Sequence, residues 1–162
     1  MFIGIDVGAS GAIAVLDAKG YLLDHAPMPT FKDGKSTRVN AAALAGFLAE
    51  YDAAKTAFVE RVGAMGKDGV RQGASSMFAF GHSAGVVEGV LAALHIPAVL
   101  ITPQAWKKGA GLIGKDKDAA RTIAARLYPF NRTLDLKGKG QALADAILIA
   151  RIGAGLGVAN GD

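Results

Sequence analysis

The chain has 162 residues, of which 51% are hydrophobic, with no cysteine and a net charge of +4. This length suits one domain with its own core, and the hydrophobic fraction excludes an intrinsically disordered protein. The lack of cysteine excludes disulfides, thiolate zinc sites and cysteine nucleophiles, so carboxylates are the obvious ligands for a metal, and Mg²⁺ or Mn²⁺ suits them best. No wholly apolar run reaches the ~20 residues of a membrane span, and the N-terminus lacks signal-peptide features. We therefore expect a soluble, cytoplasmic protein without membrane contact.

The first half of the chain predicts strands and one helix. Residues 2–7, 11–17 and 20–26 are apolar runs joined by short turns, which predicts an antiparallel meander. Residues 30–38 carry charges and a glycine, which predicts a loop. Asn40 is expected to cap a helix over 41–50, and a strand over 56–60 follows it.

The second half predicts helices around one further strand. Residues 63–73 contain four glycines and predict a flexible loop. A long helix over 74–95, a buried parallel strand over 97–101, a short helix opened by Thr102 and Pro103, and a helix over 116–127 follow. A turn over 137–140 precedes the last long helix. We therefore expect a single α/β domain over 1–158 and a tail over 159–162.

Glycines recur every four residues along the long helix, at Gly81, Gly85 and Gly89. Each costs a helix ~1 kcal/mol relative to alanine, so we expect another backbone to approach closely there. Tight packing on the sheet and contact with a second copy of the chain are both open explanations.

Three carboxylates lie in apolar surroundings. Asp6 and Glu60 each end an apolar strand, and Asp145 lies in a nearly all-apolar helix, where an isolated acid would need a partner. Each alone fits a solvated charge at the end of an element. Together they predict a shared pair of divalent ions, which would activate water and stabilise the departing oxygen of a phosphodiester. Gly8 and Gly11 leave room for a phosphate beside Asp6.

Lysines are concentrated between residues 107 and 139, which favours nucleic acid as the partner. Lys108 or Lys107, and Lys117 or Lys115, are candidates to stabilise the charge of a transition state. A solvated basic face is the alternative. His82 and His95 lack a second histidine at ligand spacing, so we assign neither to a metal. Trp106 fits a core anchor better than a base-stacking residue.

The ordered motifs of nearly the whole chain resemble the RuvC-type Holliday junction resolvases, particularly the small phage-type members of that RNase H-like superfamily. The likeness is carried by residues 4–8 with Gly11, and by 59–65, 76–81, 103–108, 115–121 and 144–147.

The resemblance implies an RNase H-like fold with a central five-stranded mixed sheet, an antiparallel meander followed by parallel strands, and flanking helices. It also implies a homodimeric endonuclease that uses two Mg²⁺ ions, for which Mn²⁺ would substitute. The enzyme would cut Holliday and other branched DNA by symmetric nicks, leaving 5′-phosphate and 3′-hydroxyl ends, in a bacterial or phage-infected cytoplasm. Asp6, Glu60 and Asp145 fall on the metal-binding acids of the family, and Lys108 and Lys117 fall near its two basic positions. The DNA-contacting candidates are Gly8, Met65, Lys67, Lys107, Lys115, Lys137 and Lys139.

Two positions depart from the family pattern. A fourth acid usually lies three or four residues before the last one, where this chain has Ala142 and Gln141. Gln141 offers a metal only a neutral amide oxygen, so the second ion would bind weakly or activity would be lost, and Asp135 is too far along the chain to replace it. Bacterial cellular members carry an aromatic wedge at the position of Gly63, and Met65 is the nearest apolar residue that could insert into an opened junction.

Three other functions remain open. An actin-like or sugar-kinase phosphotransferase shares the turn after Asp6 but needs a second half that 162 residues do not supply, so we expect no nucleotide cofactor. An RNA-processing nuclease would share both the acids and the lysines. A junction-binding protein with a decayed nuclease would explain the missing fourth acid.

Overall fold

The computed structural model describes residues 1–51, 54, 56–61, 63 and 73–159. The strands are β1 (Phe2–Asp6), β2 (Ala12–Leu16), β3 (Leu22–Pro27), β4 (Thr30–Asp33), β5 (Ser36–Val39), β6 (Thr56–Glu60) and β7 (Ala98–Ile101). The helices are α1 (Ala41–Ala49), α2 (Ala74–Ala93), α3 (Pro103–Gly109), α4 (Ala119–Leu127), the 3₁₀ turn η1 (Arg132–Asp135) and α5 (Lys137–Gly153).

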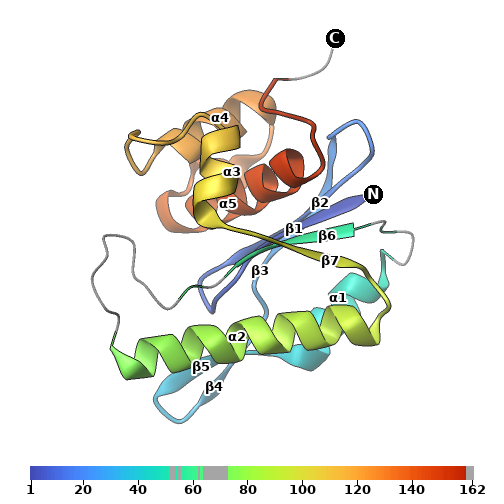
Figure 1. The fold of residues 1–162 in the computed structure, drawn as a ribbon, viewed down its shortest axis with the longest axis vertical. Helices are drawn as coiled ribbons and strands as arrows, with labels where there is room; N and C mark the ends of the chain where they lie inside the picture. The colour runs from blue at the N-terminus through green and yellow to red at the C-terminus, as the bar shows by residue number, and fades with distance from the viewer. Residues whose placement is uncertain (52–53, 55, 62, 64–72, 160–162) are drawn as a thin grey trace.

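A mixed sheet of five strands in the order β3-β2-β1-β6-β7 forms the centre of the described fold (Figure 1). β1, β2 and β3 pair antiparallel, which confirms the predicted meander. β6 pairs parallel with β1, and β7 pairs parallel with β6. The predicted RNase H-like α/β fold is confirmed in this sheet and its flanking helices.

Helices cover both faces of the sheet. In Figure 1, α3, α4 and α5 lie on one face and α1 and α2 on the other. The alternation of side chains along β1 sorts its residues between these layers. Ile3 and Ile5 join the core beneath α1 and α2, whereas Phe2 packs with the core beneath α5. Since Gly4 and Asp6 share the pleat of Phe2, Asp6 faces the α5 side.

α5 lies unusually close to the sheet because two glycines leave room for it. A Cβ added at Gly4 would lie 2.0 Å from the Ala146 carbonyl oxygen of α5. A Cβ at Gly153 would lie 2.3 Å from the Phe58 ring on β6. The central strands and α5 therefore hold each other in a fixed position, and this position determines where Asp145 lies.

Both predicted N-caps are confirmed. The Asn40 side chain accepts a hydrogen bond from the Ala43 amide at 3.1 Å, and the Thr102 hydroxyl accepts one from the Ala105 amide at 3.2 Å. Each satisfies an amide that the first helical turn leaves unpaired.

The expected loop over 30–38 is wrong, because it is the hairpin of β4 and β5. Its two-residue turn begins at Gly34, whose φ of 58° is the left-handed conformation that such turns require. Gly34, as the first of the two turn residues, is the sequence signal that could have revealed it. The two strands form a separate ribbon beside α2 (Figure 1).

Two other expectations need correction. β7 is not buried, since it is the edge strand of the sheet and Val99 is 48% exposed. A wholly apolar strand therefore ended up at an edge rather than in the middle. Residues 137–140 are not a turn but the first helical turn of α5, where Gly140 packs against the backbone of Thr133 and Leu134.

The glycines of α2 do not pack on the sheet, which removes one of the two explanations for them. A Cβ added at Gly81, Gly85 or Gly89 would meet no described atom within 4 Å. The helix instead reaches the core through Ser83, Val87, Val90 and Leu91.

The exposed side of α2 also bears on the expected absence of a membrane span. By length and mean hydropathy, α2 is the one helix in the described chain that would pass as a span, although only 17% of that window is buried. One such helix is weak support for membrane insertion.

Candidate metal centre and nucleic-acid interface

Asp6 and Glu60 end neighbouring parallel strands at the same edge of the sheet. Ile5 of β1 pairs with Val59 of β6, so the two acids follow at the next position of each strand. Phe58, two residues before Glu60, packs in the α5-side core, so Glu60 faces that side, as Asp6 does. The fold therefore brings these two predicted acids to one face and one edge.

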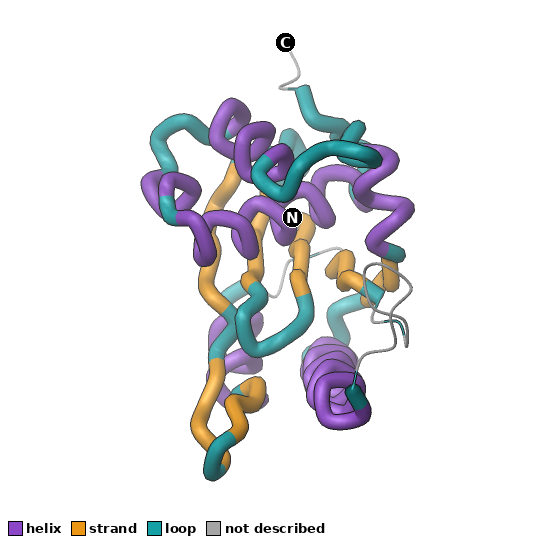
Figure 2. Tube along the Cα trace, turned by 90° about the vertical axis from the view of Figure 1, so that its left-hand side faces the viewer, coloured by secondary structure: helices purple, strands orange, loops and turns teal. Residues whose placement is uncertain are grey.

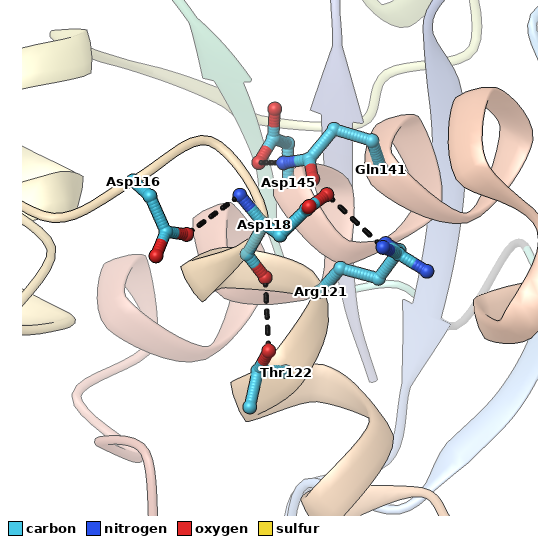
Figure 3. Close-up of polar contacts among 6 residues, drawn as sticks. All are labelled: Asp116, Asp118, Arg121, Thr122, Gln141 and Asp145. Carbon is cyan, nitrogen blue, oxygen red and sulfur yellow. Dashed lines mark hydrogen bonds and ion pairs between the residues drawn. The ribbon is translucent and has the colours of Figure 1, made fainter.

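Asp145 reaches the same face from α5. The contact of Gly4 with Ala146 sets the helix directly on β1 one residue after Asp145. The Gln141 amide donates a hydrogen bond of 2.9 Å to Asp145 Oδ1 from one helical turn earlier (Figure 3). Gln141, which occupies one of the two positions where the family has a fourth acid, therefore donates a hydrogen bond directly to Asp145.

Glu60 is held by an aromatic side chain of α3. The indole Nε1 of Trp106 donates to Glu60 Oε1 at 3.0 Å, and Trp106 is only 1% exposed. Lys107 places its ammonium 5.1 Å from the Trp106 ring centroid, within reach of a cation–π interaction. Trp106 is therefore the expected core anchor, and it also orients a candidate metal ligand. No pattern in the sequence signals this bond, which joins residues 46 positions apart.

The carboxylates of Asp6, Glu60 and Asp145 are suitable ligands for a hard divalent cation, although in this conformation they are not grouped around one position. Within the described ranges, no three Asp, Glu or His side chains are grouped closely enough to hold an ion. Glu60 is turned toward Trp106 and Asp145 is bonded to Gln141. Gln141 Oε1 is buried and accepts no hydrogen bond from the described residues. Carboxylate and amide oxygens are the ligands that Mg²⁺ and Mn²⁺ prefer, and this oxygen lacks a partner.

A hollow of about 560 Å³ adjoins this edge on the α5 side, between the β1–β2 turn and the start of α5. Lys139 lines it, and Lys137 is exposed in the same helical turn. Cations at a helix N-terminus oppose the helix dipole, so these lysines do not serve helix stability. His25 also lines the hollow. Burial lowers the pKa of its imidazole, and the negative charge of Asp24, which raises the pKa, is the smaller effect. The imidazole therefore stays neutral at neutral pH.

The other predicted lysines lie in the last turn of α3, at Lys108, and on the connection from α3 to α4, at Lys115 and Lys117. Lys108, Lys115 and Lys117 are all exposed. The acids around Lys117 are engaged locally: Asp116 accepts from the Asp118 amide at 2.9 Å, and Asp118 pairs with Arg121 at 3.0 Å (Figure 3). Asp135 pairs with Arg132 in η1, with 3.3 Å between Arg132 Nη1 and Asp135 Oδ2.

The turn after Asp6 contains a residue with a positive φ, a conformation that glycine adopts more readily than other residues. Gly8 has a φ of 128°, and a Cβ there would lie 3.2 Å from the Phe80 ring of α2. The turn is therefore packed against α2. Met65 and Lys67 lie outside the described residues, so their assignment to DNA contact stays a prediction.

Comparison with known proteins supports the fold. No family model and no curated protein matches the chain. Among solved structures, the chain is similar to RuvC of Thermus thermophilus in complex with a Holliday junction substrate, with a TM-score of 0.59, 15% identity, and coverage of 96% of this chain and 97% of that one. A second Thermus thermophilus RuvC structure matches with a TM-score of 0.50, 14% identity, and coverage of 94% and 96%. The described chain thus has a RuvC-like, RNase H-like fold along almost its entire length.

Proposed function

We propose that this protein is a structure-selective, metal-dependent endonuclease that resolves Holliday and related branched DNA junctions. The observation that carries the proposal is that Asp6 and Glu60 end adjacent parallel strands, while α5, which carries Asp145, packs on β1 on the face to which both acids point. The same fold, over the same length, is that of a RuvC solved with a Holliday junction substrate.

The acids and Gln141 would hold two divalent ions, Mg²⁺ or Mn²⁺. When bound, the ions would supply an activated water on one side of the phosphodiester and charge stabilisation for the departing 3′ oxygen on the other. Trp106 keeps Glu60 oriented through its indole N–H, and Gln141 orients Asp145. Lys107 or Lys108, and Lys115 or Lys117, would stabilise the negative charge that gathers in the transition state. Lys137 and Lys139 would contact the DNA backbone.

A homodimer explains how two symmetric nicks would be made, and α2 is where we place its interface. Gly81, Gly85 and Gly89 lie open on this helix, with no described atom within 4 Å of an added Cβ. An open glycine face lets a second helix approach closely. A dimer of this kind would act on DNA in the cytoplasm.

The test is cleavage of a labelled four-way junction beside a linear duplex and an RNA–DNA hybrid, each with Mg²⁺, with Mn²⁺ and with chelator. We expect paired nicks in the junction only, which Asp6→Asn and the chelator abolish. Asp135→Asn is the matched control, since this acid pairs with Arg132 in η1.

The other outcomes separate the alternatives. Tight junction binding without cutting by the unmodified chain in either metal would indicate a decayed nuclease, a reading that the uncharged Gln141 favours. Cutting of the hybrid alone would assign the protein to RNA processing. If the chain neither binds nor cuts any of the three substrates, the proposed function is excluded.

A further inference from the structure

A groove leads away from Asp6 on the α2 side of the sheet. A cavity of about 370 Å³ is lined by Asp6, the β1–β2 turn and α2, and one of about 470 Å³ by α2 and the hairpin of β4 and β5. Thr37, Ala79 and Ser83 line both cavities, so the two join into one depression. In Figure 2, the hairpin and the end-on α2 stand apart below the sheet.

Among the described residues, the lining of this groove is rich in hydroxyl groups and has Asp6 as its one acid. Apart from Asp6, its polar side chains are Ser10, Ser36, Thr37, Arg38, Ser75, Ser76, His82 and Ser83. Hydroxyl groups donate hydrogen bonds to phosphate oxygens without fixing a base sequence. Apart from Ser83, whose hydroxyl donates to the Ala79 carbonyl oxygen, these hydroxyl groups offer donors along the groove. The groove ends at Asp6, whose side chain faces the α5 side of the sheet.

The hairpin adds positive charge to the rim. Lys32 Nζ donates to Thr37 Oγ1 at 2.7 Å, which places its ammonium where the two cavities join. Arg38 lines the outer cavity and shares its charge with Asp33 through a contact of 2.8 Å. Lys35 at the turn is exposed. With three cations and one acid, the segment 30–39 has a net charge of +2, as the sequence gives it.

We infer that the hairpin and α2 form a track for one DNA strand that leads its phosphates to Asp6. The inference rests on the proposed function and deepens it, because it names the surface that holds the strand beside the cut. Phosphates would lie against the hydroxyl groups and the cations of Lys32 and Arg38. Phe78, exposed at the groove and 6.2 Å from the His82 ring, offers a face on which an unpaired base could stack.

The first test measures junction binding in chelator, so that cleavage plays no part. Lys32→Gln with Arg38→Gln should raise the Kd about tenfold and lower the slope of log K against log salt by about 2, one for each phosphate contact. The control is Lys19→Gln with Arg126→Gln, which removes the same charge. Lys19 lies in the β2–β3 turn at the other end of the strands, and Arg126 lies beside Val158 and Ala159 near the chain end.

The second test locates the strand directly and uses the absence of cysteine from the chain. Ser36→Cys should form a disulfide with junction DNA that carries an activated disulfide tether on phosphates near the nick, by exchange that releases the activating group as a thiol. Ala18→Cys, in the far turn, should not. Circular dichroism and thermal melting confirm that each variant is folded.

The outcomes distinguish this inference from the proposed function. If the unmodified chain binds and nicks junctions while the hairpin variant binds as tightly and Ser36→Cys fails to crosslink, the track is wrong and the nuclease stands. If the unmodified chain neither binds nor cuts a junction, both are wrong. Loss of binding in the far-end control equal to that in the hairpin variant would also overturn the track, because general charge would then explain it.

Discussion

The helices on the two faces of the sheet use glycine in opposite ways. On the α5 side, Gly4 and Gly153 lie at close contacts. A Cβ added at Gly4 would collide with the Ala146 carbonyl oxygen, and one at Gly153 with the Phe58 ring. On the α2 side, a Cβ added at Gly81, Gly85 or Gly89 would meet none of the described atoms within 4 Å. The same residue type thus marks a tight internal contact in one region and an unoccupied surface in the other.

This difference separates two tasks. α5 carries Asp145 and must be positioned closely against β1, so its contacts are built into the core. α2 is anchored by one face only, and its other face is free to meet another molecule. Substitutions on the α5 side should therefore affect folding and catalysis, whereas those on the α2 side should affect assembly.

The largest effect is expected at Asp145. Asp145→Asn should lower junction cleavage by about a thousandfold, because a lost metal ligand removes several kcal/mol of transition-state stabilisation and each ~1.4 kcal/mol is tenfold. Single-turnover cleavage in Mg²⁺ measures this, with Asp135→Asn near the unmodified rate and binding in chelator retained. A rate within threefold of the unmodified chain would remove Asp145 from the site.

The next effect concerns the contact between β1 and α5. Gly4→Ala should lower the free energy of unfolding by about 3 kcal/mol, at the upper end of the cost of overpacking, since the colliding atom is backbone and cannot rotate away. Urea unfolding followed by circular dichroism gives the value. Gly46→Ala on α1, where a Cβ meets nothing within 4 Å, is the matched control. Equal stability of the two variants would contradict the close packing of α5.

A somewhat smaller loss is expected at Arg151, which is only 2% exposed at the end of α5. Its guanidinium donates to the Tyr128 hydroxyl and to the carbonyl oxygens of Gly20, Gly157 and Ala159. Arg151→Met should cost about 2–3 kcal/mol, because these acceptors lose charged donors. Thermal and urea unfolding measure it, and Arg132→Met, at an 89% exposed side chain, should change stability little. A loss no larger than that of the control would mean that the acceptors are satisfied by water.

The smallest effect on stability is expected on α2, and there it should come with a change in assembly. Gly85→Ala and Gly46→Ala should each stabilise the folded chain by about 0.5–1 kcal/mol, because alanine favours a helix over glycine. Only Gly85→Ala should weaken the dimer, and Gly85→Arg should abolish it. Light scattering after size exclusion measures the mass. A dimer that tolerates Gly85→Arg would exclude this face as the interface.

The sequence was informative wherever chemistry is local. Alternating apolar runs set the meander, Asn40 and Thr102 set two helix starts, and two strands that end in acids indicated the candidate site. The hairpin was missed although Gly34 signals its turn. Its two strands are short and carry charged residues, so they lack the apolar pattern of a strand in the main sheet.

Tertiary structure alone decided what contacts what. Apolar composition placed β7 inside, but sheet order put it at an edge. The sequence left the α2 glycines open between sheet packing and contact with a second copy, and only the folded chain shows that they do not pack on the described sheet. The bonds from Trp106 to Glu60 and from Gln141 to Asp145 set how the candidate ligands are held. The sequence by itself determined the strand meander and the helix starts, and it predicted the three acids, since periodicity and residue type are local properties. The distances between helix faces depend on packing across the whole core, so only the folded chain determines them.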